Sequence, residues 1–360
     1  MSGIAGVFYR NGRFALAPQT MPQMVKRLHH RGIDGSGIWQ DGNIGLGHTQ
    51  LWTTPEAPYE TLPHVIRNGN LVITADVRLD NRANLFHRLQ IDKPTMGDSE
   101  LILHAYEKWG EACVDYLIGD FAFAIWDRPQ QKLFCARDHF GAKPFCYYQS
   151  SHLFAFGSEV KALFAVPEVP RQLNEGRIAD YFVPQLEGID KVSTFFEDIY
   201  HLPPAHILRV DENGLQIRCY WELEPTPERH FRSDEACHEE FQEIFAEAIN
   251  CRLRGLSQPA SMLSGGLESS SIVATARKVL GVENLQTFSA ISPPQITCGE
   301  TTHINSMLQL GSIKAHKISP WQVAALLPEI ERLFTHTDNL FDMVMFLPQV
   351  MYILAQKQGI

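Results

Sequence analysis

Ser264-Gly265-Gly266-Leu267-Glu268-Ser269-Ser270 is the stretch of this chain that decides its fold. Residues 260–263, just before it, are predicted to form a short buried strand. Residues 271–280, just after it, are predicted to form a helix that ends at Gly281. Such a turn between a strand and a helix binds anions, because its glycines let backbone N–H groups approach a phosphate and the helix dipole favours negative charge. The stretch therefore predicts a nucleotide site.

The rest of the second half alternates helices and strands. Residues 233–255 are predicted to form a helix that begins at the N-cap Ser233 and carries one apolar face, made of Phe241, Ile244, Phe245, Ala248 and Ile249. A second strand is predicted over residues 285–291, followed by more helix. This alternation is typical of an α/β domain with a parallel sheet.

Residues 1–222 follow a different pattern. Short apolar runs separated by turn clusters predict strands at 71–74, 121–126, 132–136, 145–148 and 153–156. One helix is predicted around Met21, Met24, Val25 and Leu28, and another over 99–109, between an Asp98 N-cap and Gly110. Hairpin strands with separate helices predict a layered α+β domain. The polar segment 223–232, with two prolines, is predicted to be the linker between two domains.

Composition narrows the class of protein. A net charge of −10 over 360 residues argues against a general nucleic-acid binder. Seven scattered cysteines without a C-x-x-C pair favour reduced thiols over disulfides or a zinc site. The N-terminal residues lack a basic region followed by a long apolar run, so they do not predict a signal peptide. The apolar segment 341–355 is too short and too interrupted to be expected to cross a bilayer. We therefore expect a soluble, cytoplasmic protein with no membrane or nucleic-acid partner.

The turn at 264–270 is neither a Walker A loop nor a dinucleotide fingerprint, since it lacks both G-x-x-x-x-G-K-[ST] and G-x-G-x-x-G. It resembles the S-G-G-x-D-S pyrophosphate loop of the ATP-pyrophosphatase superfamily. Enzymes of that superfamily activate a carboxylate as an acyl-adenylate and release pyrophosphate.

Six segments of the first half strengthen this resemblance. They are residues 1–6 (MSGIAG), 30–37 (HRGIDGSG), 97–100 (GDSE), 119–124 (GDFAFA), 137–144 (RDHFGAKP) and 157–163 (GSEVKAL). With 264–270 they are similar, in order, to the marker segments of the glutamine-hydrolysing asparagine synthetase family. The resemblance covers nearly the whole chain.

This resemblance implies a fold and a function. Residues 1–222 are expected to form a class II glutamine amidotransferase domain, an αββα sandwich of the N-terminal-nucleophile type. Residues 233–360 are expected to form part of a parallel-sheet ATP-pyrophosphatase domain. In the family, ammonia released from glutamine at the first site attacks an acyl-adenylate at the second, so ATP and Mg²⁺ are the expected cofactors. The implied localisation is cytoplasmic, and a homodimer is compatible with it.

Several positions depart from the family's glutaminase. Ser2 stands where the family has its nucleophilic Cys, and a hydroxyl is a far weaker nucleophile near neutral pH. Gln50 replaces the Arg that holds the glutamine carboxylate. Asp76 and Val77 replace the Asn and Gly of the oxyanion hole, where a carboxylate has the wrong sign. Asp98, which binds the substrate amine in the family, is retained, and a helix N-cap is an equal alternative for it. We expect this glutaminase to be inactive.

The synthetase positions match more closely. The resemblance assigns Ser264, Gly265, Gly266, Ser269 and Ser270 to the pyrophosphate loop, and Leu263 and Ala290 to the wall of the adenine site. Glu268 replaces the family's Mg²⁺-binding Asp and places its carboxylate one methylene farther out. Because Mg²⁺ demands near-ideal geometry, this change is expected to impair catalysis more than nucleotide binding.

The sequence ends at Ile360, before the second Gly-rich acidic loop that completes the family's ATP site. We therefore expect an incomplete synthetase domain with an open sheet edge. Lys143 and residues 159–161 are interpreted as architectural. Cys298, Glu300 and His303 are close in sequence, but without a second pair of ligands they do not predict a metal site.

Three functions remain open at this stage. The first is an ATP-dependent amide-forming ligase acting on a small-molecule or peptide carboxylate, with free ammonia or the substrate's own amine as the nitrogen donor. Relatives with a damaged first domain include β-lactam synthetases and lasso-peptide cyclases. The second is a nucleotide-binding protein without turnover, and the third is an amidohydrolase that depends on Ser2.

Overall fold

The computed structural model describes residues 1–10, 15–187, 189–225, 227–255, 258–293, 295–334, 336 and 346–360. The chain forms two compact units, Met1–Pro225 and Thr226–Ile360. The division falls inside the polar, proline-containing stretch 223–232.

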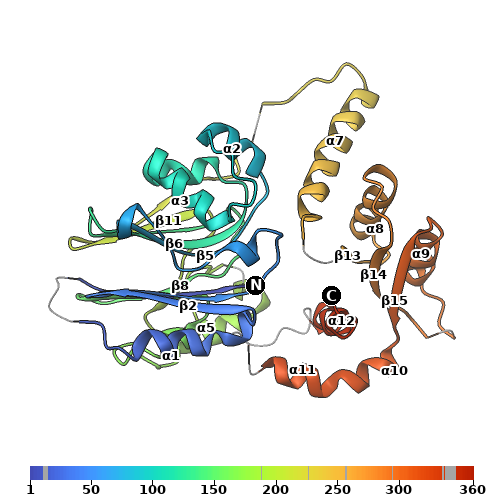
Figure 1. Cartoon of the computed structure of the whole chain (residues 1–360). Coiled ribbons are helices and arrows are strands. Elements are labelled where there is room, and N and C mark those ends of the chain that lie inside the picture. Colours follow the sequence, from blue (N-terminus) through green and yellow to red (C-terminus); the bar gives the residue numbers. More distant parts are fainter. Residues whose placement is uncertain are drawn as a thin grey trace. The chain divides into compact units, whose positions relative to one another are not determined.

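The first unit is built on two six-stranded antiparallel sheets (Figure 1). The first sheet has the order β10-β8-β9-β1-β3-β2 and the second the order β12-β11-β7-β6-β5-β4. The strands of the first sheet are β1 (Gly3–Tyr9), β2 (Gly35–Asp41), β3 (Ile44–Gln50), β8 (Cys146–Gln149), β9 (Leu153–Gly157) and β10 (Ile199–His201). Those of the second are β4 (His64–Ile66), β5 (Leu71–Leu79), β6 (Gly119–Asp127), β7 (Lys132–Arg137), β11 (His206–Asp211) and β12 (Gly214–Cys219).

Helices cover the outer face of each sheet. The helices α1 (Thr20–Arg27) and α4 (Val160–Leu163) pack on the first sheet, whereas α2 (Arg82–Leu89) and α3 (Asp98–Trp109) pack on the second. A separate core between the sheets includes Phe8, Trp126, Phe145 and Phe156. Two short helices, α5 (Glu175–Tyr181) and α6 (Pro184–Glu187), precede β10. The first unit is therefore the expected αββα sandwich.

The alternation of side chains along β1 explains why both faces of this strand are apolar. Ile4 and Phe8 point into the core between the sheets, and Ala5, Val7 and Tyr9 point into the core beneath α1 and α4. Successive side chains of a strand point to opposite faces, so a strand covered on both sides is apolar throughout.

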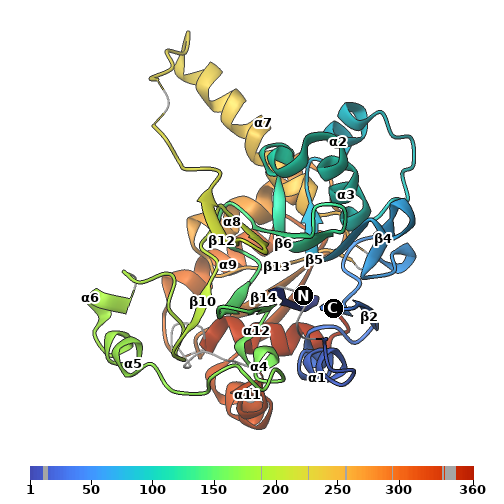
Figure 2. The same ribbon diagram turned by 90° about the vertical axis from the view of Figure 1, so that its left-hand side faces the viewer.

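The second unit has a three-stranded parallel sheet of order β13-β14-β15. Its strands are β13 (Ala260–Met262), β14 (Leu285–Ala290) and β15 (Ile313–Ile318). One face packs against α7 (Asp234–Arg252), α8 (Leu267–Ala274) and α9 (Gly299–Leu308), as Figure 2 also shows for α8 and α9. The other face packs against α10 (Pro320–Val323), α11 (Leu327–Phe334) and α12 (Phe346–Lys357). This arrangement confirms the predicted α/β class.

Several boundaries differ from those predicted. Helix α8 begins at Leu267, four residues earlier than expected, so Glu268, Ser269 and Ser270 lie in its first turns. It continues as a π-helical turn, Thr275–Val279, and Gly281 then adopts φ +66°. Pairing extends β5 and β6 beyond the predicted apolar runs, because backbone hydrogen bonds do not depend on the side chains.

The first turn of α7 is as predicted, since the Ser233 hydroxyl accepts a hydrogen bond from the Ala236 N–H at 3.3 Å. Its apolar face is only partly covered. Phe241 is 62% exposed and Ile244 is 59% exposed, while Ile249 is buried against the parallel sheet. No described helix is both long and apolar enough to span a bilayer.

Candidate functional site

The five residues that sequence reasoning placed in a glutamine site do meet in space. Ser2, Gln50, Asp76, Val77 and Asp98 all line one small cavity in the first unit. They come from the start of β1, the end of β3, the middle of β5 and the start of α3. Because these elements belong to both sheets and to a covering helix, the sandwich itself assembles the cavity.

Ser2 and Gln50 are both held by hydrogen bonds within the chain. The Ser2 hydroxyl accepts the Leu51 N–H at 3.1 Å. The Gln50 amide donates to the carbonyls of Ala57 and Glu60, at 2.9 and 3.2 Å. Gln50 therefore anchors the turn at residues 57–60, which also lines the cavity, and both hydrogen bonds use its side-chain amide nitrogen.

Asp98 does not act as an N-cap, contrary to one of the two interpretations above. Helix α3 begins at Asp98 itself, and its N-cap is Gly97. The Asp98 carboxylate instead pairs with Arg82 and accepts the Leu79 N–H at 2.9 Å. A guanidinium and a strand N–H thus engage the carboxylate of Asp98, and another side chain, that of Glu60, accepts the first-turn amides. Arg82 thus engages the carboxylate that the resemblance predicts to bind the substrate amine.

Glu60 caps α3 in place of Asp98. Its Oε1 accepts the N–H groups of Ser99 and Glu100, at 2.8 and 3.2 Å. A Cβ at Gly97 would collide with this carboxylate, so the glycine makes room for Glu60. Burial, with a smaller contribution from the Asp98 charge, raises the pKa of Glu60 to about 7. The carboxyl group of Glu60 therefore occupies space close to Asp98.

Asp76 is buried, and its charge is compensated. Its Oδ1 lies 2.9 Å from Lys143 Nζ, and its Oδ2 lies 3.6 Å from Arg31 Nη2. Arg31 also pairs with Glu159 at 2.8 Å, and Lys161 contacts the same carboxylate at 2.7 Å. The pairing removes the net negative charge, but a carboxylate still only accepts hydrogen bonds. It supplies none of the donors that an oxyanion requires.

The cavity is too small for glutamine. Its volume is about 20 Å³. A single water molecule needs roughly 10–15 Å³ on the same measure. A cavity of this size holds one water-sized molecule. Glu60 was not anticipated from the sequence, nor were the pairings of Asp76 with Lys143 and of Asp98 with Arg82, because each partner comes from a distant segment without a recognisable motif.

The second site is the turn between β13 and α8. Gly265 adopts φ +85°, a conformation that favours glycine, and a Cβ there would lie 2.5 Å from the Glu300 carbonyl oxygen. Ser264 Oγ lies 3.0 Å from Ser269 Oγ, which also accepts the Ser264 N–H at 3.1 Å. The serine contacts join the turn to the first turn of α8, and the absence of a Cβ at Gly265 lets the turn lie close to the start of α9.

The first turn of α8 supplies the remaining groups. The N–H groups of Leu267, Glu268 and Ser269 have no acceptor within the helix, because the first intrahelical bond runs from the Ser270 N–H to the Gly266 carbonyl. These amides, together with the hydroxyls of Ser264 and Ser269, are suitable hydrogen-bond donors for a phosphate. Glu268 sits in the same turn, and one carboxylate together with phosphate oxygens is a usual way to hold Mg²⁺.

A larger cavity of about 380 Å³ opens beside this turn, at the carboxyl edge of the parallel sheet. Ala290, predicted to line an adenine site, is part of its wall. Ligand pockets of about this size are common and mostly apolar. The other lining residues are mainly apolar: Ile291, Pro293, Ile318, Pro320, Val323, Phe346 and Leu347, together with Ser292, Cys298, Glu300 and Thr301. Leu263, the other predicted wall residue, is buried below Ser289, whose hydroxyl donates to its carbonyl at 2.7 Å.

Cys298 borders this cavity as the residue before α9. A hydrogen bond with Ser292 lowers the pKa of its thiol, and the N–H groups of Thr301 and Glu300 act in the same direction. Among the described residues, no group of three or more His, Cys, Asp and Glu side chains is placed to hold a metal ion.

Each of the two units matches a known protein family. Residues 1–221 match the family described as glutamine amidotransferase domain, and residues 240–358 match asparagine synthase. The chain belongs to the asparagine synthetase family. It is 34% identical, over 77% of its length, to asparagine synthetase [glutamine-hydrolyzing] 3 of Bacillus subtilis, of which it covers 45%. It is 28% identical, over 80% of its length, to a putative asparagine synthetase of Methanocaldococcus jannaschii, of which it covers 59%.

This asparagine synthetase relative thus spans about half the length of the curated relatives that it matches. Among solved structures it is similar to glutamine phosphoribosylpyrophosphate amidotransferase from B. subtilis, at 13% identity and a TM-score of 0.45. That match covers 88% of this chain and 81% of the other. At that score the likeness adds nothing to the family assignment.

Proposed function

We propose that this chain carries the nucleotide-binding part of an ATP-dependent amide-forming ligase, and that its glutamine pocket no longer supplies ammonia. The observation that carries the proposal is the turn at Gly265. Gly265 has a positive φ and lies close to Glu300. The turn leads directly into the first turn of α8, whose N–H groups have no acceptor within the helix. Glu300 also lines an apolar cavity of about 380 Å³.

The proposed binding mode follows from the chemistry of these groups. The phosphates of ATP lie against the first turn of α8, where N–H groups and the helix dipole favour negative charge. The adenine enters the apolar cavity beside Ala290. Glu268, together with the phosphates, would hold Mg²⁺, which would supply charge stabilisation for the departing pyrophosphate.

The reaction proposed is carboxylate activation. A carboxylate oxygen of the substrate attacks the α-phosphorus of ATP, and the bond to pyrophosphate breaks. An amine then attacks the acyl carbon of the acyl-adenylate, and AMP leaves. Because the cavity in the first unit has room for about one water, the amine is free ammonia or an amine of the substrate itself.

A second candidate is nucleotide binding without turnover. Glu268 favours it, because a carboxylate displaced by one methylene retains charge but misplaces a metal ion, and a misplacement of about 1 Å can cost a hundredfold in rate. Under this alternative the turn binds ATP, and no carboxylic acid elicits pyrophosphate.

The two candidates are separated by incubating the full chain with ATP, Mg²⁺ and a panel of carboxylic acids and measuring pyrophosphate. The ligase proposal expects release with at least one acid, and at least a tenfold increase in Glu268→Asp. No release from either protein with any acid, although ATP binds, would leave only the non-catalytic alternative.

A further inference from the structure

The small cavity of the first unit contains polar atoms that its own walls leave unsatisfied. His48 is 1% exposed and Asp76 is 3% exposed, and both line the cavity with Ser2. Neither His48 Nε2 nor Asp76 Oδ2 has a hydrogen-bond partner among the described residues. The Ser99 hydroxyl, from another lining residue, is likewise without a partner there. A buried polar atom without a partner costs about 1–3 kcal/mol, so three around one cavity require an explanation.

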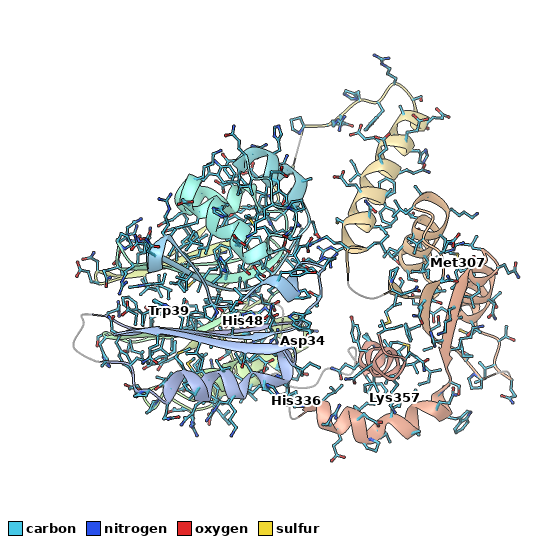
Figure 3. The ribbon with its side chains drawn as sticks, in the orientation of Figure 1. Asp34, Trp39, His48, Met307, His336 and Lys357 are labelled. Carbon is cyan, nitrogen blue, oxygen red and sulfur yellow. The ribbon has the colours of Figure 1, made fainter. Side chains whose placement is uncertain are left out.

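The hydrogen bonds of His48 define which ring nitrogen carries the proton. His48, labelled in Figure 3, lies on β3. Its Nδ1 is 3.3 Å from the Oγ1 of Thr74, a residue of β5 in the second sheet. The Thr74 hydroxyl donates its one proton to the Gly47 carbonyl at 3.0 Å. Thr74 Oγ1 must therefore accept from His48 Nδ1–H, which leaves Nε2 as a lone-pair acceptor. Burial lowers the pKa of His48 to about 4, so the ring is neutral at pH 7.

Asp76 Oδ2 presents a second acceptor. Lys143 satisfies Oδ1 at 2.9 Å, but Arg31 Nη2 lies 3.6 Å from Oδ2, beyond hydrogen-bond distance. Ser2 contributes a donor, because its hydroxyl accepts the Leu51 N–H and keeps its own proton to give. His48 Nε2, Asp76 Oδ2 and the Ser2 hydroxyl thus offer two acceptors and one donor to whatever occupies the cavity, and the Ser99 hydroxyl adds a group that can donate or accept.

We propose that this cavity is a binding site for one ordered water molecule, which donates to His48 Nε2 and Asp76 Oδ2 and accepts from the Ser2 hydroxyl. The volume of about 20 Å³ admits one such molecule, and three polar partners are the usual number for a buried water. The cations Lys143 and Arg31 already compensate Asp76, which favours a neutral occupant over ammonium. The water completes the polar network of this cavity.

The test uses the full chain. A crystal structure in which other buried waters are visible is expected to show a density peak within hydrogen-bond distance of His48 Nε2 and Asp76 Oδ2. An empty cavity would contradict the proposal. With ¹⁵N-labelled histidine, NMR is expected to show His48 Nε2 unprotonated at pH 7, and a proton on Nε2 would overturn the assignment.

Two variants provide a matched comparison. Ser2→Val adds methyl groups that fill the cavity, so the density peak is expected to vanish and the His48 Nε2 resonance to shift. Ser2→Ala leaves the space open, and the peak is expected to remain. Ammonium chloride should leave the wild-type resonance unchanged relative to sodium chloride. A saturable shift with ammonium alone would show that the occupant is ammonium and not water.

Discussion

Asp76 Oδ1 lies 2.9 Å from Lys143 Nζ inside the first unit, where the Asp76 side chain is almost completely buried. Lys143 lies in the segment between β7 and β8, and Asp76 lies on β5, so the ion pair joins that segment to the second sheet. The pair explains how a carboxylate is tolerated at a buried position for which the resemblance implies an uncharged Asn.

We predict that Lys143→Met destabilises the first unit by about 3 kcal/mol, because it removes the nearer of the two cations that compensate the buried Asp76 carboxylate and leaves only Arg31, at 3.6 Å. Urea unfolding followed by tryptophan fluorescence measures this loss. The double variant Lys143→Met/Asp76→Asn also removes the carboxylate charge and is expected to recover much of the stability. A double variant no more stable than Lys143→Met would show that the lysine acts through packing alone.

Glu60 is predicted to make the stability depend on pH. Its pKa is raised to about 7, so the folded chain binds more protons than the unfolded chain between about pH 4.5 and 7. Stability from this group therefore falls as the pH rises through that range. Glu60→Gln keeps an oxygen for the Ser99 N–H without the charge.

Glu60→Gln is accordingly expected to match the wild type near pH 4.5 and to exceed it by about 1–2 kcal/mol at pH 8. Unfolding curves of both proteins at several pH values isolate the effect, since every other group is shared. A stability difference that stays constant with pH would mean that Glu60 titrates normally.

Restoring the family's nucleophile is predicted not to restore glutaminase activity. Ser2→Cys supplies a thiol, but the cavity still holds about one water, and Asp98 is still paired with Arg82. Glutamate released from glutamine is expected to stay at background in Ser2→Cys and in the wild type. Glutamate formation by the wild type that Ser2→Ala abolishes would instead establish the Ser2-dependent amidohydrolase.

Cys298 gives a chemical probe of the larger cavity. Its thiol has a lowered pKa and lines the space assigned to adenine, so iodoacetamide is expected to alkylate it readily. Mg–ATP is expected to slow alkylation of Cys298 about tenfold or more, as followed by peptide mass spectrometry. Cys237, which is exposed on α7, is the internal control and should react at the same rate with and without ATP.

Much of the fold could be predicted because its signals are local. The apolar runs at 121–126 and 132–136 became β6 and β7, and the Gly-rich turn at Gly265 stands between a strand and a helix as expected. The family segments placed Ser2, Gln50, Asp76, Val77 and Asp98 around one cavity.

The state of the glutamine site was harder to foresee. Glu60 reaches the amides of α3 from a turn almost forty residues earlier in the chain, and no spacing rule predicts such a contact. Asp98 was expected either to bind substrate or to cap α3, and the structure pairs it with Arg82 instead. Partners such as these are chosen by tertiary packing, which a single sequence does not reveal.

The most direct test of the central claim is ATP binding by the full chain, measured by titration calorimetry with Mg²⁺ present. Gly265→Ala strains a positive φ and places a methyl group against the Glu300 carbonyl, whereas Gly281→Ala strains a positive φ in open space beyond the π-helical turn. We predict that the wild type and Gly281→Ala bind ATP and that Gly265→Ala loses at least tenfold in affinity. Equal affinities for all three proteins, or no binding by the wild type, would contradict the assignment of this turn as a nucleotide site.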